Sequence, residues 1–244
     1  MTQIPGWPQG LGLHMHERLD STNEEARRLA VAGERGPLWI LAHEQSAGRG
    51  RRGRAWVSER GNLFATLLTR AAPPVAAQLA FAAGLAAGET MAALAPNARM
   101  TLKWPNDVLL NGRKAAGILL EGLIEDALAI GVGLNLAHHP QVTEFPAISI
   151  AALTGSAPDP RDGLLRLAGR MAAWYEIWNG GGFATVRTAW LARAAGLGAP
   201  IRARLQGSEM EGVFENLDED GALLLREASG VLTRITAGDV FFRT

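Results

Sequence analysis

Runs of apolar residues separated by turn formers divide the chain into short strands and helices from its beginning to its end. Alternating or continuously apolar runs predict strands, and apolar positions three or four residues apart predict helices. Strands are predicted at residues 13–19, 37–44, 63–69, 100–104, 107–110, 117–123 and 127–136. Helices are predicted at residues 20–33, 75–94, 164–178 and 183–194. Because the two kinds of element are interleaved irregularly, we expect an α+β fold with helices packed on a mixed sheet.

The pattern changes after Gly196, where short apolar stretches follow one another closely. They are separated by Asp-Glu-Asp-Gly and Ala-Ser-Gly, which are both strong turn signals. Closely spaced short strands of this kind predict a small β-barrel. We therefore expect two units, a larger one at residues 1–196 and a small β-barrel at residues 197–244.

The predicted helix at residues 20–33 begins with a start signal. Ser21 and Thr22 each precede a glutamate by three residues, at Glu24 and Glu25, which is the spacing of a capping box. In a capping box the hydroxyl accepts a bond from the backbone of the first turn, and the glutamate accepts one in return. We expect this arrangement at the helix start.

Composition and charge exclude several classes of protein. The 24 basic and 24 acidic residues balance, so no overall field directs the chain to nucleic acid or to a membrane. The sequence has no cysteine, which excludes disulfides, thiolate metal sites and a cysteine nucleophile. No uninterrupted apolar run reaches about 18 residues, and the start of the chain lacks the pattern of a secretory signal. We expect a cytoplasmic protein.

A loop of four arginines and three glycines occupies residues 48–54, and we name it the arginine loop. Guanidinium groups stay charged and glycine resists regular structure, so the loop cannot belong to the core. Its donors suit oxyanions such as carboxylate or phosphate, and we expect it to be mobile without a ligand. For such a loop on its own, a solvated charge run or a nucleic-acid contact is the more common explanation.

A second group of polar residues surrounds a predicted hairpin. Pro105 takes the chain out of helical conformation, which places Asn106 and Asp107 at a strand end. Lys114 precedes an apolar strand, so part of its stem is buried and its charge needs an anionic partner. We expect Asp107 to be that partner, across a turn at Asn111-Gly112. The alternative is a surface lysine beside a capping Asn or Asp.

Two glycines, Gly131 and Gly133, interrupt an apolar strand that ends near Asn135. The third glycine of a dinucleotide-binding loop is missing, because Leu136 stands in its place, so we exclude a Rossmann site. The sequence has no P-loop either, and ATP would need another kind of site. Glycines in an apolar strand more often allow a ligand or another backbone to approach closely.

In this order and with this spacing, the motifs together resemble the biotin protein ligase family over nearly the whole chain. The resemblance implies a class II synthetase-like catalytic domain with an SH3-like C-terminal barrel. Family members that also act as repressors have an additional N-terminal DNA-binding domain of about 60 residues. About 20 residues precede Ser21, so we expect the monofunctional type, which does not bind DNA. The matching segments are Ser21–Asn23, Gln45, the arginine loop with Trp56, Lys103–Asp107, Lys114–Leu119 and Gly131–Asn135.

The resemblance implies that ATP converts biotin to biotinyl-5′-AMP, from which biotin passes to a lysine of a biotin carboxyl carrier protein domain. It implies that the catalytic residues, which stabilise charge between biotin and the α-phosphate, are Lys114, Arg49 and Arg51. The implied biotin-binding residues are Ser21, Thr22, Asn23, Gln45, Arg49, Gly50, Arg51, Lys114 and Gly117. The implied nucleotide-binding residues are Arg52, Arg54, Trp56, Lys103, Asn106 and Asn135.

The implied partners are biotin, ATP with Mg²⁺, and the carrier domain of a carboxylase, with neither DNA nor a membrane. Asp107 either orients Lys114 or binds Mg²⁺, and the chain is either a monomer or a homodimer. A lipoate ligase of the same fold is the nearest alternative, although the arginine loop and Lys103–Asp107 resemble the biotin branch. An octanoyl transferase needs a cysteine nucleophile and is excluded. A nucleic-acid-binding module would need a basic and aromatic stripe, which the rest of the chain lacks.

Overall fold

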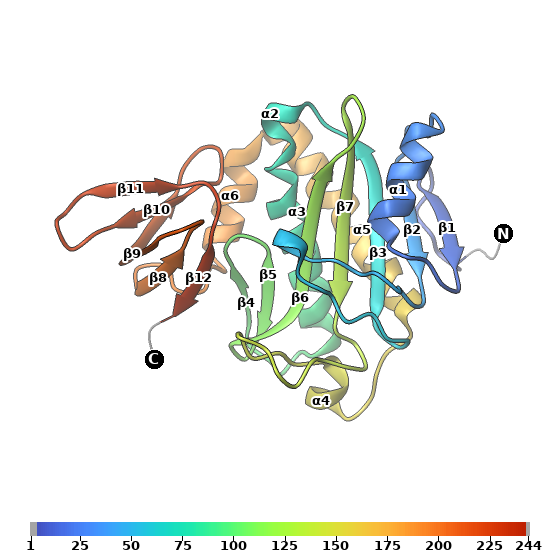
Figure 1. Cartoon of the computed structure of the whole chain (residues 1–244). Coiled ribbons are helices and arrows are strands. Elements are labelled where there is room, and N and C mark those ends of the chain that lie inside the picture. Colours follow the sequence, from blue (N-terminus) through green and yellow to red (C-terminus); the bar gives the residue numbers. More distant parts are fainter. Residues whose placement is uncertain (1–3, 243–244) are drawn as a thin grey trace.

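The larger part of the protein is a seven-stranded sheet formed by β1 (Gly12–His16), β2 (Leu38–Ala42), β3 (Leu63–Arg70), β4 (Met100–Lys103), β5 (Asp107–Leu110), β6 (Arg113–Gly122) and β7 (Ala127–Leu134). In this computed structural model, which describes residues 4–242, the strand order is β1-β2-β3-β7-β6-β5-β4 (Figure 1). β1 and β2 are parallel, and all other neighbours are antiparallel. The prediction of a mixed sheet is confirmed. The outer ends of the two expected units, 1–3 and 243–244, lie outside the described residues.

Helices cover both faces of this sheet (Figure 1). The helix α1 (Thr22–Val31) packs on β2, β3 and β7 from one side. On the other side α3 (Leu79–Leu94) packs on the sheet, and α5 (Pro160–Gly181) and α6 (Phe183–Leu191) pack on α3. A short helix, α4 (Ile150–Thr154), precedes α5. These helices confirm the α+β prediction.

The helix predicted at residues 75–94 is divided into two, which corrects the sequence prediction. A short helix α2 (Pro73–Ala76) precedes α3. Between them the N–H groups of Gln78 and Phe81 donate to the carbonyl three residues back, and this tightens the backbone into a 3₁₀-type turn. Gln78 also accepts a hydrogen bond from the indole of Trp178 at 2.9 Å, which ties this turn to α5.

The C-terminal part of the chain is a separate five-stranded antiparallel sheet, as expected for a small barrel-like domain. Its strands are β8 (Pro200–Arg204), β9 (Glu209–Leu217), β10 (Leu223–Arg226), β11 (Leu232–Ile235) and β12 (Asp239–Phe242). Their order is β11-β10-β9-β8-β12. The indole of Trp104, in the loop after β4, donates to the carbonyl of Gly221 at 3.0 Å and attaches this sheet to the larger part. No helix within residues 4–242 has the length and apolarity needed to cross a membrane.

Residue size differs between the two faces of the central strands, because successive side chains of a strand point to opposite faces. Towards α3, the strands β6 and β7 present large apolar side chains such as Ile118 and Ile130. Towards α1, the same strands present glycine at Gly117, Gly131 and Gly133. The missing side chains leave room for a hollow on the α1 face.

Candidate active site

A cavity of about 390 Å³ lies on the α1 face of the sheet, over the glycines of β6 and β7. Its walls are the arginine loop, the segment 140–147 that follows β7, and the strand β12. All the predicted site residues line this cavity except Arg52. The segments singled out in the sequence therefore come together in space, although they are spread over nearly half of the chain.

One end of the cavity holds a hydrogen-bonded group formed by the start of α1 and the loop after β2. The backbone N–H of Thr22 donates to Oε1 of Gln45 at 2.8 Å, and the Thr22 hydroxyl lies 3.1 Å from the same oxygen. The Gln45 amide nitrogen donates to the hydroxyl of Ser58 at 3.0 Å. The Gln45 side chain is thereby fixed in one orientation, with Ser21 beside it in the wall.

The prediction of a capping box at this helix start is wrong. Ser21 is the N-cap residue in extended conformation, but its side chain accepts no capping hydrogen bond. The carboxylate of Glu24, which would complete the box, is bound instead by Arg49 of the arginine loop at 2.9 Å. Glu25 is similarly bound by Arg28 at 2.7 Å. The hydroxyl of Ser21 is thus left for the cavity rather than for the helix.

A buried polar chain supports this end of the cavity from below. The amide nitrogen of Asn23 donates to Glu121 at 2.7 Å, and its Oδ1 accepts from the hydroxyl of Thr66 at 2.6 Å. Thr66 also lies 2.8 Å from the hydroxyl of Thr22. Sequence reasoning missed Thr66 and Glu121, and the one available signal was a threonine inside the apolar run of β3. Asn23 was predicted to bind biotin, but its side-chain amide is bound to Glu121 and Thr66.

The glycines of β6 and β7 make room for protein side chains, which refines the expectation that they admit a ligand or backbone. A Cβ atom on Gly133 would lie 2.6 Å from the indole of Trp56, and one on Gly117 would lie 3.0 Å from it. A Cβ on Gly131 would clash with the amide oxygen of Asn23. Trp56 therefore lies on the sheet surface and forms part of the cavity wall.

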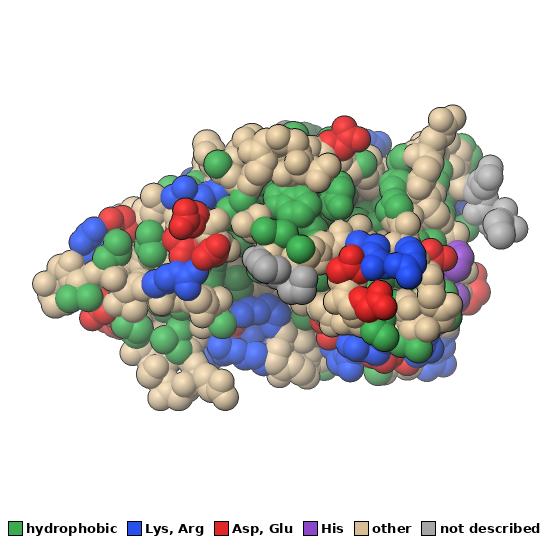
Figure 2. Space-filling view, turned by 90° about the horizontal axis from the view of Figure 1, so that it is seen from above, with side chains coloured by type: hydrophobic (Ala, Val, Ile, Leu, Met, Phe, Trp, Pro, Cys, Tyr) green, Lys and Arg blue, Asp and Glu red, His purple; other side chains and the backbone are tan. Residues whose placement is uncertain are grey.

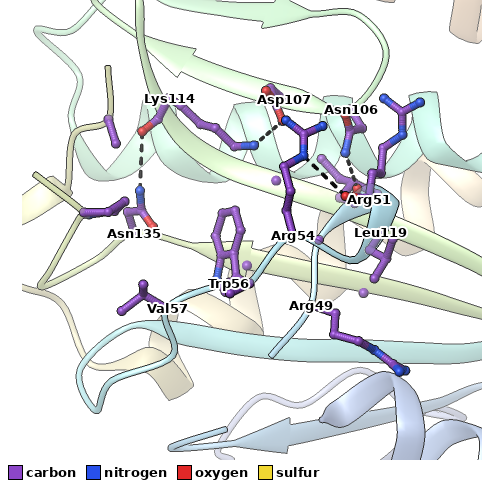
Figure 3. Close-up of a pocket in the computed structure, with 18 of the residues that line it drawn as sticks. Arg49, Arg51, Arg54, Trp56, Val57, Asn106, Asp107, Lys114, Leu119 and Asn135 are labelled. Carbon is purple, nitrogen blue, oxygen red and sulfur yellow. Dashed lines mark hydrogen bonds and ion pairs between the residues drawn. The ribbon is translucent and has the colours of Figure 1, made fainter. Parts of the chain in front are cut away.

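The other end of the cavity contains two lysines that share one carboxylate. The Nζ of Lys114 lies 2.6 Å from Oδ1 of Asp107 (Figure 3). The Nζ of Lys103 lies 3.6 Å from Oδ2 of the same carboxylate. The predicted pairing across the Asn111-Gly112 turn is confirmed. Lys103 is buried and its Nζ lies 4.5 Å from the centre of the Phe145 ring. Burial lowers the pKa of Lys103, although the negative charge of Asp107 opposes that effect.

The surroundings of Asp107 do not fit a magnesium site held by the protein. Both carboxylate oxygens face ammonium groups, and Mg²⁺ would have to displace them. Within residues 4–242, no group of three or more His, Asp or Glu side chains is arranged to hold a metal ion. Of the two roles left open by the sequence, the geometry favours orientation of Lys114.

The arginine loop makes defined contacts, and all four of its arginines bind partners within the protein. Arg49 turns towards α1 and Glu24, away from Lys114 (Figure 3). Arg51 donates to the carbonyl of Gly238 at 3.1 Å, and Arg54 donates to Asp239 at 2.8 Å. Arg52 also reaches Asp239, at 3.3 Å, but unlike the other three arginines it does not line the cavity. None of these contacts to the C-terminal sheet was expected from the sequence.

The two asparagines predicted to contact the nucleotide have their amide nitrogens bound within the protein. Asn106 donates to the carbonyl of Ile118 at 2.6 Å, and Asn135 donates to that of Ile148 at 3.2 Å. Both side chains are therefore held in fixed positions in the cavity wall. Their role towards a nucleotide stays a prediction.

Beyond Asn135, four lining residues with charged or aromatic side chains were not recognised in the sequence. Two come from the segment after β7 and two from β12, namely Glu144, Phe145, Asp239 and Phe241. The ring of Phe241 lies 5.9 Å from the Nζ of Lys103, and 4.8 Å from the guanidinium of Arg204. No local pattern marks them, because their importance comes from the contact between the two sheets.

On the face seen in Figure 2, several basic side chains lie next to acidic ones. The arginine loop likewise forms ion pairs with Glu24 and Asp239. A protein that binds the phosphate backbone of nucleic acid needs basic side chains that are free to face it. The pairing of the loop arginines does not support the nucleic-acid alternative.

Comparisons with known proteins agree with this geometry. Residues 15–135 match the model of the Biotin/lipoate A/B protein ligase family, and residues 196–243 match that of the Biotin protein ligase C terminal domain. A biotin–[acetyl-CoA-carboxylase] ligase of Paracoccus denitrificans is 48% identical over 93% of this chain and 99% of its own length. The enzyme of the same name from Mycobacterium tuberculosis is 33% identical, over 96% of this chain and 89% of its own.

The solved structures include a biotin protein ligase of Aquifex aeolicus in complex with biotin and ATP. It superimposes with a TM-score of 0.82 at 27% identity, over 95% of this chain and 98% of its own. The fold and the cavity thus define a protein ligase of the biotin/lipoate class. More narrowly, the chain belongs to the biotin protein ligase family.

Proposed function

We propose that the chain joins biotin to a lysine of a biotin carboxyl carrier protein domain in two steps, with biotinyl-5′-AMP as the intermediate. The observation on which this rests is the two-ended cavity. A neutral hydrogen-bonding group around Thr22 and Gln45 lies at one end, and the lysine pair lies at the other. Biotin has the same two kinds of end, a neutral ureido ring and a carboxylate.

The ureido ring of biotin would bind at the α1 end. A ureido group offers two N–H donors and one carbonyl acceptor, so it needs fixed partners of both kinds. The hydroxyls of Ser21 and Thr22 supply both, and Gln45 is held beside them. Preorganised partners lower the free-energy cost of ordering the site on binding.

Lys114 would act on the first step. A carboxylate oxygen of biotin attacks the α-phosphorus of ATP, the bond between the α- and β-phosphates breaks, and pyrophosphate leaves. Like charges about 4 Å apart repel by several kcal/mol in a partly dry site unless cations compensate them. The ammonium of Lys114, oriented by Asp107, supplies that compensation together with Arg51 of the arginine loop.

The second step needs no covalent enzyme intermediate. The amine of the acceptor lysine attacks the carbonyl carbon of the mixed anhydride, the bond to the phosphate oxygen breaks, AMP leaves, and the attacking nitrogen loses a proton. Because water also hydrolyses the anhydride, the site must exclude it until the acceptor arrives. The arginine loop over the cavity is suited to that exclusion.

We further treat residues 1–196 as the catalytic unit and 197–244 as the C-terminal unit, and we expect the reaction in the cytoplasm. In this reading the C-terminal unit contributes one wall of the site, because Asp239 and Phe241 line the cavity. ATP would enter between this wall and the lysine pair. Arg52, which lies outside the cavity lining, is then a contact to the C-terminal unit and not a first contact to the nucleotide.

The decisive experiment measures the two half-reactions separately. Exchange of labelled pyrophosphate into ATP is expected with biotin and not with lipoate as the acid. A carrier domain should then gain the mass of one biotinyl group, and the same domain with its acceptor lysine changed to arginine should gain none. Exchange with lipoate at a rate similar to that with biotin would indicate the lipoate branch. Exchange with neither acid would refute the proposal.

A further inference from the structure

A single carboxylate of the C-terminal sheet binds the arginine loop. Asp239, the first residue of β12, accepts from Nη2 of Arg54 at 2.8 and 3.0 Å and from Nη1 of Arg52 at 3.3 Å. Arg51 lies 3.9 Å from the same carboxylate, and it also donates to the carbonyl of Gly238 next to it. Three arginines of one loop thus depend on one short segment that lies about 185 residues further along the chain.

The same carboxylate is tied to the opposite wall of the cavity. Nη2 of Arg204, on β8, lies 3.4 Å from Asp239, and its guanidinium forms a two-pronged pair with Glu144 at 2.5 and 2.7 Å. Glu144 belongs to the segment that follows β7 and lines the cavity. Asp239 therefore sits at the centre of a network that joins both cavity walls to the C-terminal sheet.

The environment of Asp239 differs from that of an ordinary surface ion pair. Its side chain is 12% exposed, whereas the partners of most exposed pairs remain in water. Burial raises the pKa of Asp239, but the hydrogen bond and charge of Arg54 and the charge of Arg52 outweigh this effect and lower the pKa overall. If its arginines were removed, this buried carboxylate would be left uncompensated.

We propose that Asp239 is a positioning residue that holds the arginine loop closed over the cavity, so that the C-terminal sheet controls closure of the active site. That Asp239 restrains the arginine loop follows from the contacts alone, whereas the effect of this restraint on catalysis rests on the proposed function. The other backbone hydrogen bonds of the loop, such as those from Gly50 to Arg54 and from Trp56 to Gly48, join residues of the loop to one another. They do not attach it to the C-terminal sheet, so loss of Asp239 should release the loop from that sheet and open it. An open loop would weaken ATP binding and release the adenylate.

Trypsin digestion without any ligand measures how strongly Asp239 restrains the loop, because trypsin cleaves after arginine. The test compares Asp239→Asn with wild type and with Asp220→Asn. Asp220 is an exposed aspartate of the same sheet, paired with Arg234 at 2.9 Å and absent from the cavity lining. Cleavage within residues 48–54, identified by fragment mass, is expected to be at least about tenfold faster in Asp239→Asn, and within about twofold of wild type in Asp220→Asn. Asp239→Glu, which keeps the charge, should recover part of the protection.

Kinetics then measure the consequence for the reaction. In Asp239→Asn the KM for ATP should rise at least about fivefold and the adenylate should leave faster, while the Kd for biotin without ATP changes by less than about twofold. Thermal unfolding of each variant establishes that it is folded. Wild-type resistance of the loop to trypsin in folded Asp239→Asn would overturn the proposal. A lower KM for ATP would also overturn it, because it would show that Asp239 competes with the phosphates. If loop cleavage is faster in Asp239→Asn but the wild-type protein shows no pyrophosphate exchange, the role of Asp239 in restraining the loop is supported. Only the proposed function is then refuted.

Discussion

The ammonium of Lys114 and the carboxylate of Asp107 lie 2.6 Å apart, across the hairpin that joins β5 and β6. The carboxylate is shared with the buried Lys103, so two positive charges converge on one negative charge at the cavity wall. The group as a whole keeps a positive charge. Such a site attracts a further anion, and this is what charge compensation between a carboxylate and a phosphate requires.

Replacement of Lys114 by alanine tests that function directly. Loss of one preorganised charge-stabilising donor typically slows the chemical step by about 10²-fold or more, and we expect Lys114→Ala to slow pyrophosphate exchange by at least that factor. Arg113→Ala is the matched control, because Arg113 is the exposed cation next to it on β6. An exchange rate near that of wild type in Lys114→Ala would contradict the assigned role.

Gly133 should not tolerate a side chain, since its missing Cβ is where Trp56 packs. In Gly133→Ala the new methyl would lie 2.6 Å from the indole, and Trp56 would have to leave the sheet surface. Gly122→Ala is the control, because a Cβ at that end of β6 meets no atom within 4 Å. We expect Gly133→Ala to raise the Kd for ATP by about tenfold or more and Gly122→Ala to change it little. Isothermal calorimetry measures both, and equal affinities would show that Trp56 is not part of the binding wall.

The local part of this site could be predicted from the sequence, and the distant part could not. The pairing of Asp107 with Lys114 spans seven positions and a recognisable turn, so residue type and spacing were sufficient. The capping box failed because Glu24 is bound by Arg49, and nothing near either residue indicates that contact. Asp239 gave no signal, because a strand start with an aspartate is common and its partners lie about 185 residues away.

The same distinction holds for the fold. Most strands and helices followed from apolar periodicity, which is a property of each segment. The position of β3 between β2 and β7 depends on which strands pair, and that is decided by packing across the whole sheet. The turn that divides residues 73–94 into two helices is bound by Trp178 of α5 through Gln78, a contact which the segment itself does not reveal.

The start of α1 should respond to acid through Asp20. The bidentate hydrogen bond from Arg28, together with the N–H of Ser21, holds the pKa of Asp20 at about 2, below its ordinary value of 3.8. Because the pKa is lower in the folded protein, this pair stabilises the fold above about pH 4 and the contribution is lost as the pH falls towards about 2. Both side chains are nearly half exposed, so we expect at most about 1 kcal/mol.

The comparison of wild type with Asp20→Asn isolates this contribution. The difference between their unfolding free energies, from urea titrations, should be largest at about pH 6 and should shrink steadily below about pH 4. Asp159 pairs with Arg161 at 2.8 Å outside the cavity. The variant Asp159→Asn therefore provides a second ion pair for reference. A difference for Asp20→Asn that stays constant over the whole range would show that the ion pair contributes nothing.

Thr66 should determine how tightly the ureido ring is held, although it does not line the cavity. The Oδ1 of Asn23 can only accept, so the single proton of Thr66 is directed to it. The proton of the Thr22 hydroxyl is then directed either to the Thr66 oxygen at 2.8 Å or to Oε1 of Gln45 at 3.1 Å. Thr22 is thereby held with its lone pairs towards the cavity. In Thr66→Val both contacts are lost, and the buried oxygen of Asn23 is left without its 2.6 Å donor.

We expect Thr66→Val to raise the Kd for biotin by about tenfold and to lower the unfolding free energy by about 1–3 kcal/mol. Thr66→Ser keeps the hydroxyl and should restore most of the affinity. Thr69→Val is the matched control, because Thr69 is also buried on β3 but its side chain points to the opposite face of the sheet. Calorimetry with biotin in the absence of ATP separates ring binding from adenylation. If Thr66→Val is less stable yet binds biotin like wild type, the hydroxyl serves the core alone, and Thr22 must be oriented by Gln45.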